Sequence, residues 1–306
     1  MTDDEVKVKK ERDPIMVVCF VVFLIASLAV IGASVYNNVS GDDTRVVVGD
    51  TVSVDYVGSF YGFYEETNYV VFDTSRWSVA DNDNVLKSNS FNLKDENLYK
   101  PLSFKVGGTT VLKMFGDSVI GYKVGDKIRV MIPSGQGYNG PDTLTTVQSS
   151  AAYSVPLTEK ITASQFADLY GFSLSGIVSL EKSVYGWPAV AAFNTSDNTV
   201  TMTYSPGVGQ EYVVVDDDFG KLVYKVTSVS STISFTQHVS DFTVVSQSGN
   251  VKSIQMIEVN LGTEKYFITS VTDTNNDGVS ESFAYKTVGE TVNEDLYFVI
   301  EIKSIN

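Results

Sequence analysis

Few side chains in this sequence are suited to acid, base or nucleophilic catalysis. Cys19 is the only cysteine and His238 the only histidine. A single cysteine excludes a disulfide framework, a cysteine metal cluster and a Cys–His nucleophile pair. Gly116-Asp117-Ser118 is similar to a hydrolase block, but it lies inside a predicted helix and His238 has no suitable acidic partner motif. These residues give no support to a nucleophilic active site.

Two loop motifs look like ligand sites and are better explained as turns. Residues 135–140 read G-x-G-x-x-G after a predicted strand, but residues 141–146 lack the helical pattern that a dinucleotide site needs. Residues 273–278 begin like a calcium loop, but the twelfth position is Ala284 instead of Glu. A turn is favoured there over an ion site, which stays open as the alternative. We expect neither a cofactor nor a metal.

Composition narrows the class of protein. The 306 residues are 43% hydrophobic and 19% charged, so the chain can bury a large core and is expected to form about two domains. Its net charge is -15, and clustered Lys and Arg occur only among the first dozen residues. Because phosphate binding needs such clusters, the sequence predicts no nucleic-acid partner.

The N-terminal part has the pattern of a membrane anchor. Residues 15–36 are apolar or small and carry no charge, which as a helix matches the roughly 30 Å of a bilayer core. This length favours an uncleaved transmembrane helix over a cleaved signal peptide. Basic residues lie in the tail at 1–14 and acidic ones in the linker at 37–45, so the positive-inside rule places the N-terminus in the cytoplasm. The main domain is then extracytoplasmic, on a single-pass cell-membrane protein.

Beyond the linker, the hydrophobic pattern alternates with the period of two that is typical of half-buried strands. Strands are predicted at residues 52–56, 70–72, 102–106 and 128–132, with a turn at 73–75 and a long surface loop at 77–100. Between the last two strands, Val111, Leu112, Phe115 and Val119 lie on one face of a short helix that ends at Gly121.

The order of motifs along these elements resembles that of the FKBP-type peptidyl-prolyl isomerases. The motifs are Tyr56-x-Gly58, Val71-Phe72-Asp73-Thr74-Ser75, Pro101-x-x-Phe104-x-Val106-Gly107, Val111-Leu112-x-x-Phe115, Gly121-x-x-Val124-Gly125-Asp126-Lys127, Ile132-Pro133 and Gly137-Tyr138. The resemblance resumes at residues 296–302, which look like the last strand of that family.

The resemblance implies an α+β fold in which an FKBP-like antiparallel sheet wraps around one short helix. This FKBP-like domain would be discontinuous, formed by residues 46–140 and 288–306. Residues 141–287 would be β-rich and chaperone-like, inserted in the flap as in SlyD-type and archaeal members. Within the insertion we predict a helix at 163–170, and strands at 199–204, 211–215, 221–229 and 253–259.

The resemblance also assigns the site. Phe115 would be the floor of a proline pocket, Tyr138 would donate its hydroxyl to a substrate carbonyl, and Asp73 would be the charged group at the edge. The walls would be Tyr56, Phe72, Val111, Leu112 and Phe298, with Leu102 and Phe104 as further candidates. Two simpler explanations stay open: an aromatic residue on an amphipathic helix is often core, and Asp73 is in the right place to form a turn.

The implied activity is peptidyl-prolyl cis-trans isomerisation for the folding of exported proteins. The barrier to rotation of an X-Pro bond, about 20 kcal/mol, arises from amide resonance, so no proton has to move and no cofactor is needed. An apolar pocket can favour the twisted amide. The partners would be unfolded or proline-containing polypeptides and, through the N-terminal helix, a membrane. The alternative is a non-catalytic FKBP-fold binding or holdase module on the cell surface.

Overall fold

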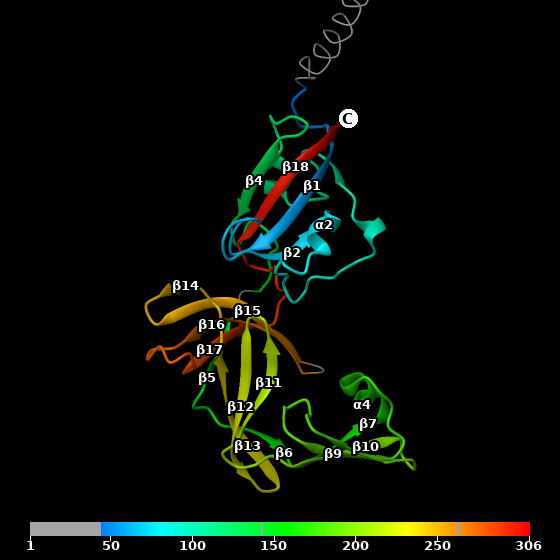
Figure 1. Cartoon of the computed structure of the whole chain (residues 1–306), viewed down its shortest axis with the longest axis vertical. Coiled ribbons are helices and arrows are strands. Elements are labelled where there is room, and N and C mark those ends of the chain that lie inside the picture. The colour runs from blue at the N-terminus through cyan, green and yellow to red at the C-terminus, as the bar shows by residue number, and fades with distance from the viewer. Residues whose placement is uncertain (1–43, 142, 262–263) are drawn as a thin grey trace, which may run out of the picture.

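The computed structural model describes residues 44–141, 143–261 and 264–306. They form an elongated molecule with four sheets, in which the C-terminus lies beside the first sheet at one end (Figure 1). The chain leaves the first sheet after β4 (Lys127–Ile132) and returns to it with β18 (Leu296–Ile305). We call β1–β4, β18 and the helices α2 and α3 the first unit. The inserted segment is the part of the chain from β5 to β17, which includes α4.

The first unit is built on a five-stranded antiparallel sheet. Its order is β2-β1-β18-β4, and β3 also pairs with β1. The strands are β1 (Thr51–Phe60), β2 (Val70–Thr74), β3 (Leu102–Lys105), β4 (Lys127–Ile132) and β18 (Leu296–Ile305). The last strand of the chain is therefore at the centre of the sheet, between β1 and β4, where its alternate residues Leu296, Phe298, Ile300 and Ile302 are buried.

A short helix, α3 (Lys113–Ser118), packs on this sheet next to β4. Phe115 and Val119 are buried on its inner side, whereas Lys113 and Asp117 form an ion pair on the exposed side. The helix stops before Gly121, which has φ +84°, a left-handed conformation that glycine adopts without strain.

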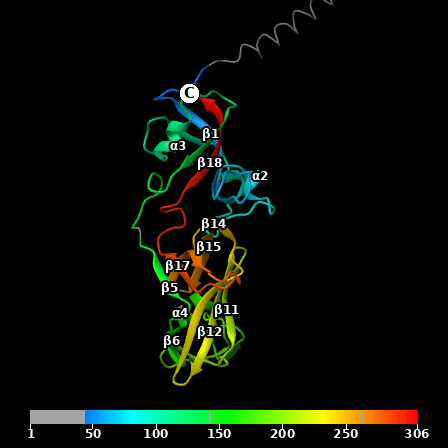
Figure 2. The same ribbon diagram turned by 90° about the vertical axis from the view of Figure 1, so that its left-hand side faces the viewer.

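The inserted segment contains three further antiparallel sheets, ordered β7-β10-β9-β8, β11-β12-β13-β6 and β14-β15-β16-β17-β5. Its elements are β5 (Thr145–Gln148), β6 (Tyr153–Pro156), β7 (Thr158–Thr162), α4 (Ala163–Tyr170), β8 (Ile177–Leu180), β9 (Ala189–Asn194), β10 (Thr199–Tyr204), β11 (Glu211–Asp217), β12 (Gly220–Val229), β13 (Thr232–Ser240), β14 (Val244–Ser248), β15 (Val251–Leu261), β16 (Glu264–Thr272) and β17 (Ser282–Lys286). The sheet that contains β15 and β17 lies next to the first unit, and β12 lies beyond it (Figures 1 and 2).

The predicted helix at 163–170 is confirmed as α4, and its ends show why it forms there. The Thr162 hydroxyl accepts from the Gln165 N–H, and the Gln165 side chain accepts from the Thr162 N–H, which makes a capping box. Gly171 ends the helix with φ +74°. Phe166 is fully buried on the inner side. The predicted strands at 199–204, 211–215, 221–229 and 253–259 correspond to β10, β11, β12 and β15.

The inserted segment is hydrogen-bonded to loops of the first unit. The Met256 N–H on β15 donates to the Tyr61 hydroxyl at 3.0 Å. The Asn89 side chain donates to Asp217 at 3.1 Å and to the Met256 carbonyl at 3.4 Å. Apolar side chains also cross this junction, since Met256 belongs to the buried core of the first unit and Val70 to that of the inserted segment. The two parts are therefore packed against each other.

The predicted α+β class is wrong. The described residues form eighteen strands, but only three α-helices, of four, six and eight residues. The reason is that the inserted segment contributes thirteen of the strands and a single helix, α4. The expected transmembrane helix at 15–36 lies outside the described residues, and no helix that the structure describes is long and apolar enough to cross a bilayer. The described fold is therefore mainly β.

Two local expectations are also corrected. The turn predicted at 73–75 is mostly strand, because β2 continues through Thr74. The predicted surface loop at 77–100 contains α2 (Trp77–Ala80) and a 3-10 turn (Glu96–Leu98). Val79 and Val85 from this stretch are buried against β1 and β2, which the polar composition of the segment concealed.

Candidate active site

Four aromatic side chains from four elements meet in the first unit. Tyr56 is on β1, Phe72 on β2, Phe115 on α3 and Phe298 on β18. The ring centroids of Phe115 and Phe298 are 5.1 Å apart. The centroid of Tyr56 lies 5.8 Å from that of Phe115, and the centroid of Phe72 lies 5.6 Å from that of Phe298. These contacts are edge-to-face, an arrangement that aromatic pairs favour. We call these four residues the aromatic cluster.

The aromatic cluster has a buried base and a partly exposed side. Phe115 and Phe298 are only 4% and 5% exposed, while the other two rings are half-buried. Val111 and Leu112, just before α3, are also half-buried and pack against the same core. Apolar surface is therefore accessible above a closely packed aromatic base.

Gly58 makes room for two of these rings. A Cβ atom at this position would lie 2.8 Å from atoms of both Phe298 and Phe72. Such a distance is well below van der Waals contact, so any side chain here would displace the rings. Gly58 pairs with Phe298 across the β1–β18 ladder, which explains why the rings approach its backbone.

One carboxylate borders the cluster. The Tyr56 hydroxyl donates to Asp73 Oδ2 at 2.6 Å, and the Thr74 N–H donates to Asp73 Oδ1 at 2.9 Å. Burial, followed by the charge and hydrogen bond of Asp73, raises the pKa of Tyr56 far above its ordinary value. The Tyr56 phenol is therefore protonated at neutral pH and holds the half-buried carboxylate in place.

Tyr138 lies at the margin of the cluster. Its side chain is 47% exposed, and its pKa is raised first by burial and then by the charge of Asp73, so its hydroxyl is within electrostatic reach of that carboxylate. The Tyr138 carbonyl accepts from the Asn293 N–H at 2.8 Å. The chain that returns from the inserted segment thus positions the backbone of Tyr138.

Comparisons with known proteins agree with this geometry. Residues 42–157 match the profile of the family described as FKBP-type peptidyl-prolyl cis-trans isomerase. These residues include β1–β4, so we refer to the first unit as the FKBP-type domain for its similarity to this family. The chain is also 28% identical over 157 residues to a protein of Methanocaldococcus jannaschii named short-type peptidyl-prolyl cis-trans isomerase. That alignment covers 51% of this chain and 81% of the relative.

The FKBP-type domain brings most of the predicted site residues together. Tyr56, Phe72, Phe115 and Phe298 form the cluster, Asp73 is hydrogen-bonded to it, and Val111 and Leu112 pack beside it, with Tyr138 at its margin. Their roles in binding or catalysis stay predictions. Of the two further candidates, Phe104 contacts Phe115 at 5.7 Å and is buried, whereas Leu102 packs at the side of the core.

Two contributors were missed as site residues. Gly58 is one, and the other is Phe60, whose ring lies 4.7 Å from that of Phe72. The signal was present in the spacing, because Tyr56, Gly58 and Phe60 are two residues apart on one strand and therefore share a face.

The chemistry of the cluster is that of a binding surface for an uncharged ring. Aromatic and aliphatic side chains surround a single carboxylate whose nearest hydroxyl is protonated. Among the described residues, no three His, Cys, Asp or Glu side chains are grouped so as to hold a metal ion. The arrangement can exclude water from a bound apolar group and present hydroxyl groups at its rim.

The calcium-like loop at 273–278 has an ammonium group at its centre. The Lys252 Nζ donates to Asp273 Oδ2 at 2.7 Å and to Asn276 Oδ1 at 2.8 Å. Burial alone would raise the pKa of Asp273, but the Lys252 ammonium and the N–H groups of Gly278 and Asp277 lower it below its ordinary value. The loop connects β16 to β17, and the turn favoured by the sequence stays a prediction.

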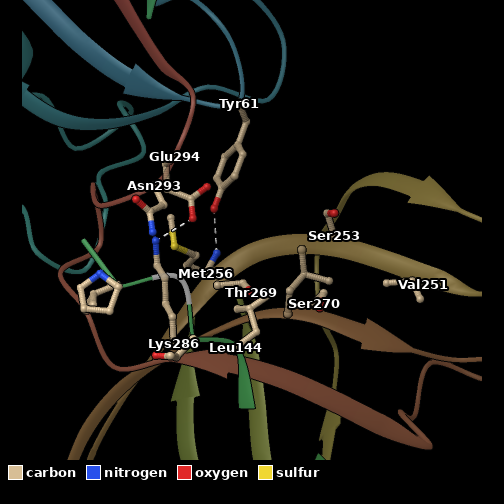
Figure 3. Close-up of a pocket in the computed structure, with 14 residues that line it drawn as sticks. Tyr61, Leu144, Val251, Ser253, Met256, Thr269, Ser270, Lys286, Asn293 and Glu294 are labelled. Carbon is tan, nitrogen blue, oxygen red and sulfur yellow. Dashed lines mark hydrogen bonds and ion pairs between the residues drawn. The ribbon is translucent and has the colours of Figure 1, made fainter. Parts of the chain in front are cut away.

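A cavity of about 310 Å³ lies at the junction of the FKBP-type domain and the inserted segment (Figure 3). The buried Lys286 Nζ donates to Glu294 Oε1 at 2.6 Å, and to the carbonyls of Glu290 and Val292 at 2.9 Å. All three hydrogens of this ammonium are used, which is the pattern of a structural lysine. It orders the returning chain that contains Asn293.

Proposed function

We propose that this chain is a peptidyl-prolyl cis-trans isomerase that acts at the aromatic cluster of its FKBP-type domain. The observation that carries the proposal is the closure of the cluster by Phe298, which joins an apolar base to half-exposed walls and one carboxylate. The match of residues 42–157 to the isomerase family supports the same activity.

In the proposed mechanism, the proline ring rests on Phe115 and Phe298, with Tyr56, Phe72, Val111 and Leu112 around it. The planar X-Pro amide is stabilised by resonance, and rotation costs about 20 kcal/mol. The twisted amide has lost charge separation, so an apolar, water-poor surface binds it better than the planar form. The exposed Tyr138 hydroxyl donates to a substrate carbonyl and fixes the peptide while the bond rotates. No proton transfer is required.

The test is the isomerisation rate of a short X-Pro peptide with the full-length chain and two tyrosine variants. Tyr138→Phe removes the proposed donor, and Tyr122→Phe is the matched control because Tyr122 is 42% exposed in the same domain. Both residues are exposed, so both variants are expected to fold. We expect a lower rate for Tyr138→Phe and an unchanged rate for Tyr122→Phe. A wild-type chain that leaves the uncatalysed rate unchanged would instead make the domain a non-catalytic binding module.

The proposed substrates are proline-containing segments of unfolded polypeptides, and the inserted segment would help to hold them. The inserted segment packs against the FKBP-type domain through Tyr61, Asn89 and Met256. This packing supports the proposal, because a substrate polypeptide bound by the inserted segment stays near the aromatic cluster. Suppression of the aggregation of a proline-limited folding substrate measures the holding activity separately from the rate on short peptides.

The location outside the cytoplasm stays a prediction from the sequence of residues 1–45 alone. Protease digestion of intact cells tests it, because the described part of the chain would be digested only if it faces outward. Protection of that part in intact cells, with digestion after lysis, would contradict the prediction.

A further inference from the structure

Exposed apolar side chains gather at the end of the FKBP-type domain that lies away from the inserted segment. The described chain begins at this end, and the C-terminus lies beside it (Figure 1). Two loops contribute the side chains, residues 44–50 before β1 and residues 119–126 after α3. Val47, Val48 and Val124 are more than half exposed, and Ile120 and Tyr122 are more than one-third exposed. We call these five side chains the end patch.

Backbone hydrogen bonds join the two loops into one surface. The Val46 N–H donates to the Tyr122 carbonyl at 2.8 Å, and the Gly121 N–H donates to the Val46 carbonyl at 2.8 Å. The Arg45 guanidinium donates to the Gly121 carbonyl at 2.8 Å. Val46 itself is fully buried and belongs to the core of the domain. The end patch is therefore a fixed surface of the domain, and its apolar side chains are exposed although a buried position lies between them.

The rim of the end patch is basic. Arg45, Lys105 and Lys123 are exposed, and Lys105 pairs across the sheet with the first residue of β1. The acids of the two loops are Asp50 and Asp126, which are half-buried. Each accepts a backbone N–H from its own loop, at 2.8 and 3.0 Å, respectively. The exposed charges around the apolar side chains are therefore positive, although the whole chain has a net charge of -15.

This composition fits a lipid surface. Tyrosine is favoured at the level of lipid headgroups, where its ring is apolar and its hydroxyl stays wet. Lysine and arginine can lay their aliphatic stems on apolar surface while their charges reach anionic phosphates. A large exposed apolar patch with a polar rim marks an interaction site.

The position of the end patch in the chain favours lipid over a protein partner. The sequence enters this end of the domain shortly after its uncharged apolar stretch at residues 15–36, a composition that favours lipid over water. Even when fully extended, residues 37–43 can span at most about 25 Å. A lipid surface that holds the apolar stretch is therefore within reach of the end patch.

We propose that the end patch rests on a lipid surface, with its apolar side chains among the headgroups and its basic rim against anionic lipid phosphates. This inference goes beyond the proposed function and does not depend on it.

The contact would leave the substrate side of the aromatic cluster accessible. β4 begins at Lys127, directly after the second loop of the end patch, and ends at Ile132, beside Gly137. Its 6 residues span about 20 Å, so Tyr138 and the end patch lie at opposite ends of the strand. The inserted segment extends away from the lipid surface (Figures 1 and 2).

The experiment places a fluorophore on the full-length chain in vesicles of phosphatidylcholine and phosphatidylglycerol. In a Cys19→Ser background, Tyr122→Cys carries the label at the end patch. Leu98→Cys is the matched control, because Leu98 is an exposed apolar residue of the same domain, in the 3-10 turn beside α2. Lipid with a nitroxide near the headgroup should quench the Tyr122→Cys label at least about twofold more than the Leu98→Cys label. Equal quenching of the two labels would overturn the proposal.

A charged substitution tests whether the apolar side chains make the contact. Val48→Glu, added to the Tyr122→Cys chain, should lower the quenching to the level of the Leu98→Cys label, because a carboxylate is unfavourable among anionic headgroups. Val208→Glu is the matched control, an exposed valine in the inserted segment, and should leave the quenching unchanged. Both valines are exposed, so both variants are expected to fold. An equal effect of the two substitutions would contradict the assigned contact.

Two further outcomes bear on the occupant. Vesicles without phosphatidylglycerol should quench the Tyr122→Cys label less, and unchanged quenching would overturn the role given to the basic rim. Self-association that Val48→Glu abolishes, without any quenching by lipid, would overturn the proposal, since a second copy would then cover the end patch.

The isomerisation rate of a short X-Pro peptide separates this inference from the proposed function. Val48→Glu should retain the wild-type rate, because no residue of the end patch belongs to the aromatic cluster. Quenching at the end patch of a chain without isomerase activity would reject the proposed reaction and leave the lipid contact standing.

Discussion

The aromatic cluster of the FKBP-type domain is enclosed by paired strands and a helix, whereas the cavity between the inserted sheets is bordered by β5 and β6, which within the described part of the chain are each paired on one side only. Both contain closely packed aromatic rings. Only the first has a carboxylate, Asp73, held by a tyrosine hydroxyl. Packed aromatic rings therefore occur in both regions, and the carboxylate distinguishes the candidate active site.

This difference corresponds to a property of proline. Proline has no N–H and cannot complete a strand ladder, so a site for it has to recognise the ring. Enclosed aromatic side chains can do this without a free strand edge. The following predictions test whether isomerisation depends on the aromatic cluster and not on the inserted segment, from the largest expected effect to the smallest.

Phe115→Ala should have the largest effect. It removes the central ring of the cluster, and truncation of a buried phenylalanine typically costs about 3–5 kcal/mol of unfolding free energy. Phe166→Ala is the matched control, because Phe166 is a buried phenylalanine on another short helix, α4, in the inserted segment. Urea denaturation should show losses of similar size. Isomerisation should be lost only in Phe115→Ala, and an equal loss in both variants would mean that the rate reports stability alone.

Gly58→Ala should have the next largest effect. Its Cβ would meet Phe72 and Phe298 at 2.8 Å, and overpacking of this kind costs about 1–3 kcal/mol. Gly176→Ala in the inserted segment is the control, because a Cβ there meets no heavy atom within 4 Å. Thermal unfolding should show a decrease only for Gly58→Ala, with a lower isomerisation rate. Unchanged activity would show that the positions of the two rings do not matter.

Tyr56→Phe should have a smaller effect. It removes the hydrogen bond to Asp73, which is half-buried and regains water, so the loss is about 1 kcal/mol. The control is Tyr204→Phe, which removes the hydroxyl that donates to Glu159 in the inserted segment. Both variants should lose stability in urea denaturation, and only Tyr56→Phe should alter isomerisation. A changed isomerisation rate in Tyr204→Phe would contradict the prediction, because it would mean that a hydrogen bond in the inserted segment affects the aromatic cluster.

A change of pH between about 6 and 9 should have the smallest effect on the isomerisation rate. The pKa of Tyr56 is raised, so the phenol is protonated in the folded state throughout this range. For a raised pKa, the contribution to stability is complete below the unfolded value of about 10 and is lost as the pH rises above it towards the folded value. Isomerisation should be constant from about pH 6 to 9. A decrease centred near pH 8 would contradict this assignment.

Much of the local structure could be predicted from the sequence. Alternation locates the buried residues of β1, β4 and β18, and the pattern of Thr162, Gln165 and Gly171 fits the ends of α4. These signals are periodic or lie within one helical turn, so they do not depend on the rest of the fold. The structure of the polar stretch at 77–100 was harder to predict, because its buried side chains, Val79 and Val85, are isolated and do not recur with a helical or strand period.

Less of the candidate site could be predicted from local pattern alone. Phe298 lies far from Phe115 along the chain, and only a resemblance to known motifs placed the two together. The role of Gly58 was missed because it depends on rings contributed by β2 and β18. The mainly-β class was missed for a related reason, because the weight of the thirteen inserted strands was underestimated.

The sequence by itself determined the apolar periods, the capping residues of α4 and the order of the motifs around Phe115. Only the tertiary structure decided which strands are neighbours, that β5 and β6 are left at sheet edges, and that Lys252 occupies the centre of the calcium-like loop. The physical reason is that periods and caps are set by neighbouring residues. Strand pairing and the burial of a charge depend on groups brought together from distant parts of the chain.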